Sequence, residues 1–215
     1  MNGAILVTWL GHACFRMEHR GWSLIIDPYA DGYVDGLPPL RAAADAVYCT
    51  HGHGDHNAAD VITVSGANPP EDFRVCTVSC PHDDRGGALR GMNEIHRFSF
   101  GERTVVHMGD VGCCPLEEET VRPLRGCDLL LIPVGGFFTV DAAAARALTE
   151  QIAPRAVAPM HYRSEKPAFG FDVLSTVEDF AALFPAEMVT RLDGPSFSLT
   201  ETGPKGLILP RLILG

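Results

Sequence analysis

The 215-residue chain lacks three features that would direct its interpretation toward other classes of protein. No apolar run is long enough to cross a bilayer, so a membrane-spanning helix is not expected. No CxxC pair occurs among the seven cysteines, which argues against a structural zinc site built from thiolates. No GxSxG motif occurs, so the sequence does not predict a serine nucleophile at a strand-to-helix turn.

Positive charge is also scarce. Seventeen basic residues stand against 27 acidic ones, and the formal net charge of −10 argues against nucleic acid as a partner. The odd number and irregular spacing of the cysteines indicate buried free thiols in a reducing cytoplasm rather than a secreted disulfide framework. The N-terminus has no basic segment followed by a cleavage site, so no signal peptide is expected. With 46% hydrophobic residues, we expect a single domain over residues 1–215.

Short apolar runs bounded by glycine, proline or charged residues predict strands along the whole chain. The predicted strands are Ile5–Trp9, Ala13–Met17, Ser23–Ile26, Ala46–Thr50, Phe73–Val78, Glu94–Phe98, Thr104–Met108, Asp128–Ile132, Ala156–Pro159, Met188–Arg191 and Phe197–Thr200. The predicted helices are Pro115–Arg122, Asp141–Ile152, which Asp141 caps, and Val173–Leu183. Strands outnumber helices, which favours an α+β fold of mixed sheets covered by helices. The apolar tail Gly206–Gly215 is expected to form a last strand or packing arm, with a contact in a homo-oligomer as the alternative.

The most informative segment is His51-Gly52-His53-Gly54-Asp55-His56, directly after a predicted buried strand. It holds four potential ligands within six residues, and imidazole nitrogen and carboxylate oxygen suit zinc and similar divalent ions. The two glycines let the backbone turn tightly, so that successive side chains can converge. Asp110 and His161 each follow another predicted strand, and strand ends are where mixed folds assemble sites from distant parts of the sequence.

The HxHxDH motif resembles the signature of the metallo-β-lactamase superfamily. Within that superfamily the chain is similar to the branch of ascorbate-6-phosphate lactonase-like proteins and small uncharacterised hydrolases. The segments that carry this narrower likeness are Trp9-Leu10-Gly11-His12, Leu24-Ile25-Ile26-Asp27-Pro28, Gly109-Asp110 and Pro159-Met160-His161-Tyr162. The resemblance spans about residues 5–162. It implies a four-layer αββα sandwich, in which two mixed β-sheets are flanked by helices and the metals lie at one edge between the sheets.

The resemblance also implies two divalent metal ions, with Zn²⁺ expected and Mn²⁺ or Fe as alternatives. The implied ligands are His51 and His53 for the first ion, Asp55, His56 and His161 for the second, and Asp110 as the bridge between them. The superfamily's di-iron oxygen reductases have glutamate where this chain has His53, so the resemblance points to hydrolysis.

The third ligand of the first ion is less sharply indicated. His82 follows a predicted strand and precedes a glycine-rich loop, and we choose it for this position. His107 is the competitor, because it lies three residues before Asp110 on a strand. We expect His107 instead to hydrogen-bond a ligand or a substrate group. Asp83 could bind the ion or orient a ligand instead, and we leave these alternatives open.

Further side chains are expected around the ions. The resemblance places His12 near the metals, and we expect His12 and His107 to stabilise an anionic intermediate while Asp55 holds the nucleophile in line. Asp27 is expected to orient a ligand histidine or a loop backbone. Four basic residues are weaker candidates for binding an anionic substrate, with ordinary surface charge as the alternative: Arg85, Arg90, Arg163 and Lys166. Phe137 and Phe138 are expected either in a pocket wall or in the core.

We therefore expect a metal-dependent hydrolase that uses a hydroxide shared by two ions to cleave an ester-like bond. The bond is expected in a small, anionic molecule such as a lactone or a phosphoester. A phosphodiesterase or nuclease is one alternative, which the acidic composition disfavours. A metal-binding scaffold or sensor without activity is the other.

Overall fold

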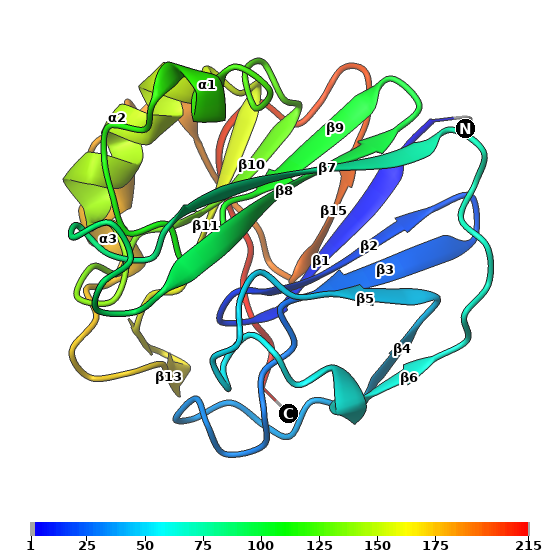
Figure 1. Cartoon of the computed structure of the whole chain (residues 1–215), viewed down its shortest axis with the longest axis horizontal. Helices are drawn as coiled ribbons and strands as arrows, with labels where there is room; N and C mark the ends of the chain where they lie inside the picture. Colours follow the sequence, from blue (N-terminus) through cyan, green and yellow to red (C-terminus); the bar gives the residue numbers. More distant parts are fainter. Residues whose placement is uncertain (1–2, 215) are drawn as a thin grey trace.

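The computed structural model describes residues 3–214, whose apolar runs fold into two main sheets that share one core (Figure 1). The five-stranded sheet has the spatial order β15 (Ser196–Leu199), β1 (Ile5–Gly11), β2 (Cys14–His19), β3 (Trp22–Ile26) and β5 (Ala46–Tyr48). The seven-stranded sheet has the order β14 (Val189–Arg191), β16 (Gly206–Leu209), β11 (Ala156–Met160), β10 (Leu129–Pro133), β9 (Arg103–His107), β8 (Met92–Phe100) and β7 (Phe73–Pro81).

Strand direction decides which ends of these sheets meet. In the five-stranded sheet only β3 and β5 pair in parallel, so β1, β3 and β5 all run the same way. In the seven-stranded sheet β9, β10 and β11 are parallel, while β8 is antiparallel to both of its neighbours. Consequently β7 also ends at the same edge as β9 and β11. The amide of His161 donates to the carbonyl of His12 at 3.3 Å, which joins this edge to the end of β1.

Large apolar side chains fill the space between the sheets. Trp9 and Phe15 from the five-stranded sheet and Phe98 and Phe100 from β8 are at most 2% exposed. The burial of such side chains is worth roughly 1.5–3 kcal/mol each, which makes this core the main source of stability. The packed core therefore holds the strand ends, and the site that they carry, in fixed positions.

The α-helices lie together on the side of the seven-stranded sheet that faces away from the five-stranded sheet (Figure 1). They are α1 (Glu118–Val121), α2 (Ala142–Ile152) and α3 (Val177–Ala181). Beside β5, the small ladder of β4 (Ala42–Ala44) and β6 (Ile62–Val64) and the 3-10 helix η1 (Ala59–Val61) occupy the other end of the molecule (Figure 1). The remaining short elements are β12 (Ser164–Glu165), β13 (Ala168–Phe169) and the 3-10 helix η2 (Ala186–Met188). The predicted α+β class with two mixed sheets is confirmed.

The ends of the helices and the tail confirm some predictions and correct others. The carboxylate of Asp141 accepts from the amide of Ala144 at 2.9 Å, so the predicted cap of α2 is confirmed. The predicted helix Val173–Leu183 forms only as the five residues of α3. The tail supplies β16 as expected, Gly215 lies outside the described residues, and the contact in a homo-oligomer stays a prediction.

The seven cysteines are all free, and they differ in exposure. Cys14, Cys80 and Cys127 are buried as predicted, whereas Cys76 is exposed on β7. No helix within residues 3–214 combines the length and the apolar character needed to span a membrane.

Candidate metal centre

Six strands release functional side chains at the common edge of the two sheets. His12 follows β1, Asp27 follows β3, the His51–His56 segment follows β5, His82 follows β7, Asp110 follows β9 and His161 follows β11. Because these strands run in the same direction within each sheet, segments far apart in the sequence meet at one place. The structure thus brings together all seven predicted ligands, together with His12.

The carboxylate of Asp110 lies at the middle of this cluster and is 2% exposed. Its Oδ1 lies 3.2 Å from Nε2 of His56. Its Oδ2 lies 3.3 Å from Nε2 of His82 and 3.3 Å from Nε2 of His161. The ring of His51 is also close, with Nε2 at 3.8 Å from Oδ2. One carboxylate therefore faces histidines from both sheets, as a bridging ligand would.

The other members form two groups around this carboxylate. On one side His51, His53 and His82 present ring nitrogens within 4.8 Å of one another. On the other side a carboxylate oxygen of Asp55 and ring nitrogens of His12, His56 and His161 also lie within 4.8 Å of one another. His82, rather than His107, completes the first group.

Four of the buried nitrogens and oxygens that converge here make no hydrogen bond in the part of the chain that the structure describes. Nε2 of His51, His56 and His161 and Oδ1 of Asp110 are buried and make no hydrogen bond within the described residues. Leaving such atoms unsatisfied costs about 1–3 kcal/mol each. Three histidines in one group and a mixed His/Asp set in the other fit divalent ions such as zinc, which take imidazole nitrogen and carboxylate oxygen. The donor set therefore fits two metal ions.

Burial keeps part of the cluster neutral in the metal-free chain. Desolvation, together with repulsion from His56, lowers the pKa of His51 to about 3. Desolvation and the neighbouring His161 lower the pKa of His12 to about 4. Neutral imidazole is the form that coordinates a metal, so His51 is ready to bind near neutral pH.

The pKa values of His161 and His56 shift in the opposite direction. Burial lowers the pKa of His161, but attraction to Asp110 outweighs it and raises the pKa to about 9. Burial of His56 is likewise outweighed by Asp110 and Asp27, and its pKa lies well above the ordinary value. The same pairs hold the pKa of Asp110 well below its ordinary value against desolvation. Protons on these rings therefore compensate the buried carboxylate when no metal does.

Asp27 orients His56, as the sequence predicts. Its Oδ2 accepts from Nδ1 of His56 at 2.7 Å and from Oγ1 of Thr50 at 2.8 Å. Its Oδ1 accepts from the amide of Thr50 at 2.7 Å. With Nδ1 engaged, the ring presents Nε2 to the cluster, which is how a carboxylate behind a ligand histidine fixes its tautomer.

Asn93 holds the backbone of Asp110 in place, and the sequence reasoning missed this residue. Asn93 is the second residue of β8, and its Oδ1 accepts from the amide of Asp110 at 2.8 Å. Its Nδ2 donates to the carbonyl of Met108 at 2.8 Å. Gly109 makes room for this contact, with a φ of +54°. No sequence signal marks Asn93, because it acts through pairing of β8 with β9.

His12, Asp27 and His161 also adopt the left-handed backbone conformation, with φ of +50°, +52° and +53°. Residues other than glycine adopt it at some cost in energy, and such strain gathers at functional sites. Each of the three follows the end of a strand, where the turn directs its side chain toward the cluster.

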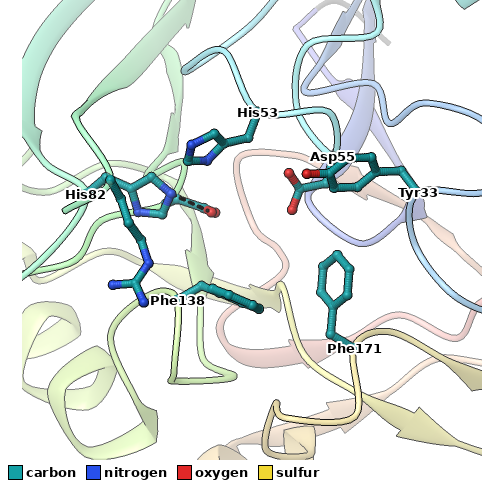
Figure 2. A pocket seen from close by; sticks show the side chains of 8 residues that line it. Tyr33, His53, Asp55, His82, Phe138 and Phe171 are labelled. Atoms are coloured by element: carbon teal, nitrogen blue, oxygen red, sulfur yellow. Dashed lines mark ion pairs between the residues drawn. The ribbon is translucent and has the colours of Figure 1, made fainter.

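The cluster opens into a cavity of about 350 Å³ (Figure 2). Its lining is Tyr33, His53, Asp55, His82, Arg90, Asp110, Phe138 and Phe171. Figure 2 shows Phe138 and Phe171 opposite His53, with the His82–Asp110 ion pair dashed. Of the two phenylalanines left open by the sequence, Phe138 belongs to the pocket wall, whereas Phe137 is 65% exposed. Tyr33 and Phe171 come from loops that carried no motif.

The structure separates the four basic candidates. Arg90 lines the cavity. Arg85 and Lys166 are exposed and lie outside its lining. Arg163 is held elsewhere, because its Nε donates to the carbonyl of Leu174 at 3.2 Å. Arg85 and Lys166 therefore fit the alternative of ordinary surface charge, whereas Arg90 lies where it can meet a ligand.

His107 also differs from its predicted role. Its Nε2 lies 2.9 Å from the carbonyl oxygen of Ala13, and its Nδ1 accepts from the amide of Gly109 at 3.1 Å. It is fully buried and does not line the cavity. The predicted contact of His107 with a ligand or substrate is thus not found, because its strand position turns the ring toward the facing sheet. His12 is buried behind Asp55, with Nε2 3.2 Å from Oδ2.

The comparisons with known proteins agree with this geometry. The family model described as "Beta-lactamase superfamily domain" matches residues 6–161. A metal-dependent hydrolase of Methylobacterium nodulans is 32% identical, with 74% of this chain and 85% of the relative covered. One of Carboxydothermus hydrogenoformans is 28% identical, with 74% and 84% covered. A Thermotoga maritima crystal structure, assigned as a Zn-dependent hydrolase of the metallo-β-lactamase superfamily, is 25% identical with a TM-score of 0.74, covering 97% of this chain and 100% of that one.

A substitution at Gly109 tests the packing that places Asp110. A Cβ atom there would collide with Oδ1 of Asn93 and lie 2.7 Å from Cβ of Thr50. We expect Gly109→Ala to lower the free energy of unfolding by about 2–4 kcal/mol in urea titrations of metal-free protein, from overpacking and backbone strain together. Gly126→Ala is the matched control, because Gly126 has a φ of +65° and open space around it. It should lose only about 1 kcal/mol. Equal losses in the two variants would contradict the packing argument.

The raised pKa of His161 predicts how metal-free protein responds to pH. Its folded pKa of about 9 exceeds the ordinary 6.5. The charged form therefore stabilises the fold fully below pH 6.5, and this contribution is lost as the pH rises through about 9. We expect His161→Gln to flatten the fall in unfolding free energy between pH 7 and 9 by up to about 1.4 kcal/mol per pH unit.

His12→Gln is the control for this pH dependence. The pKa of His12 is lowered to about 4, so its stabilising neutral form is already complete above pH 6.5 and adds no slope there. This variant should retain the wild-type slope between pH 7 and 9, measured by urea unfolding in chelator. A wild-type slope in His161→Gln would mean that the ion pair with Asp110 does not carry the effect.

Proposed function

Because the chain belongs to the β-lactamase superfamily, we propose that it is a metal-dependent hydrolase that cleaves an ester-like bond in a small molecule. The observation that carries the proposal is the convergence of seven histidine and aspartate side chains, with buried and unpartnered donor atoms, at the base of a cavity. The relatives whose names describe metal-dependent hydrolases support the same reaction class.

We assign the residues to two ions. His51, His53 and His82 would hold the first, and Asp55, His56 and His161 would hold the second. Asp110 would be shared by both, because its carboxylate lies within 3.3 Å of rings from both groups. The nitrogen-rich first group suits Zn²⁺, and Mn²⁺ or Fe remain alternatives for the same donors.

Divalent ions in such a set, when bound, polarise a carbonyl or phosphoryl oxygen and lower the pKa of a coordinated water toward neutrality. The chain's own residues hold the side chains of the centre in position. Asp27 and Asn93 hold His56 and Asp110 in fixed orientations. His12, neutral near pH 7, donates through Nε2 to Asp55 and so fixes this carboxylate at the cavity. We therefore assign His12 a positioning role, and Asp55 direct contact with the reacting groups.

The cavity sets the size of the substrate. Its volume of about 350 Å³ lies near the lower end of the range of small-molecule pockets, which begins at about 300 Å³. Among the described residues Arg90 is the one arginine or lysine in its lining, and the chain as a whole is acidic. Both observations favour a lactone, a phosphoester or a related small molecule over a nucleic acid. The seven free cysteines support a reducing compartment such as the cytoplasm.

Metal analysis of the purified chain tests the proposal most directly. We expect about two transition-metal ions per chain in protein prepared without chelator. Asp110→Asn and His51→Ala should each lower this number by about one or more, because each removes a ligand. His96→Gln is a control outside the centre, where the ring lies 3.0 Å from Oγ1 of Thr77, and it should keep the wild-type content. A count near zero that added zinc does not raise would contradict the proposal.

Activity is measured on the same proteins. A panel of p-nitrophenyl phosphodiesters, phosphomonoesters and lactones is assayed with added zinc or manganese. We expect turnover of at least one class and a loss of about a hundredfold or more in kcat for Asp110→Asn. Full metal content with no turnover of any class would favour the scaffold or sensor.

A further inference from the structure

The wall of the cavity has a composition that the metal centre does not explain. Four of its eight lining residues belong to the centre, three are aromatic, and the eighth is Arg90. The aromatic rings contact one another edge to face, with Phe138 and Phe171 at 5.6 Å and Tyr33 and Phe171 at 6.4 Å between ring centroids. Such a wall offers flat apolar surface next to the donors of the centre.

The guanidinium of Arg90 is held in place without being neutralised. It lies over the ring of Phe138, 5.7 Å from the centroid. Among residues 3–214 it forms no ion pair, whereas Arg41 pairs with Asp31 at 2.5 Å and Arg191 with Glu178 at 2.6 Å. In a chain with ten more acidic than basic residues, an uncompensated arginine inside a cavity is available for a ligand.

The backbone that carries Arg90 is fixed by Asp83. Its carboxylate is 2% exposed and accepts four backbone amides, which belong to Arg85, Gly87, Leu89 and Arg90. The amide of His82 donates to the carbonyl of Gly91 at 3.0 Å and closes the turn. The turn therefore joins His82 of the centre and Arg90 of the wall in one rigid unit. Preorganised groups of this kind lose little entropy when a ligand binds.

We propose that Arg90 is a specificity-determining residue that binds an anionic group of the substrate. The substrate class is a small molecule with a flat, apolar or aromatic body that carries a carboxylate, sulfonate or phosphate group beside the scissile bond. Guanidinium groups bind such anions through paired hydrogen bonds, and the aromatic wall contacts the body. That this molecule is a substrate rests on the proposed hydrolytic function, whereas its binding at Arg90 does not.

Paired probes of equal shape and different charge test this inference. The anionic probe is 2-naphthalenesulfonate, since sulfonates are weak metal ligands, and the neutral probe is 2-naphthyl methyl sulfone. Calorimetric dissociation constants are measured for zinc-loaded and chelator-treated protein. We expect the wild type to bind the sulfonate about tenfold more tightly than the sulfone, and Arg90→Met to abolish this preference.

Two controls separate charge recognition from folding. Arg90→Met keeps a long side chain against Phe138, and its binding of the neutral sulfone should stay within about twofold of the wild type. Arg122→Ala removes an exposed arginine outside the cavity, and it should leave both affinities unchanged. Arg90→Lys should recover part of the preference, because it restores charge without the planar pair of donors.

The outcomes distinguish this inference from the proposed function. Loss of the preference in Arg90→Met supports anion recognition even when no member of the hydrolase panel is turned over. Equal wild-type affinities for the two probes, or a preference that survives Arg90→Met, would overturn the inference, and turnover of the panel would then still support hydrolysis.

Discussion

The site depends on one buried charge, the carboxylate of Asp110. Removing a carboxylate from water costs several kcal/mol unless positive charge compensates it. The metal-free fold provides this compensation with protons on His56 and His161, whose pKa values are raised by the same carboxylate. Divalent ions would supply the charge more completely, because they bind the neutral rings and the carboxylate together. Protons and metal therefore compete for one cluster, and the affinity for metal is tied to pH by the geometry around Asp110.

The direction of the strands makes this geometry available. β1, β3 and β5 end at one edge of their sheet, and β7, β9 and β11 end at one edge of theirs. Each end delivers one side chain or one short segment, so the cluster is assembled from six places without a long functional loop. The core between the sheets fixes the distance between the two edges, and the bond from His161 to His12 fixes their contact. A shift of one sheet against the other would change the distances from Asp110 to His51 and His56, which come from the five-stranded sheet. Asn93 acts within the seven-stranded sheet, where it ties the backbone of Asp110 to β8.

The sequence predicted most of the residues that converge at the site because their signal is local. The His51–His56 segment holds four of them, and Asp110 and His161 stand at the ends of apolar runs. The choice between His82 and His107 was harder, because it depends on where a strand ends and on which face a residue points. β7 ends at Pro81, which releases His82 at the edge, whereas His107 is still within β9 and meets Ala13. The predicted helix Val173–Leu183 was too long because a tertiary contact replaces its first turn. The amide of Ser175 donates to the carbonyl of Gly135. Arg90 could not be distinguished from Arg85 before the turn organised by Asp83 was known.

The position of Arg90 in the cavity of an acidic protein raises the question of how an anion approaches it. The Debye length is about 8 Å at physiological ionic strength, so distant carboxylates on the surface are largely screened from a ligand within the cavity. A small anion therefore responds mainly to Arg90 and to the metal centre. A nucleic acid carries many phosphates, and most of them would remain outside the cavity, against an exterior with a net charge of −10. The same charge distribution thus admits a small anion and disfavours a polyanion. The proposed selectivity for small anionic molecules therefore rests on Arg90 within the cavity, and it requires no steering by the protein as a whole.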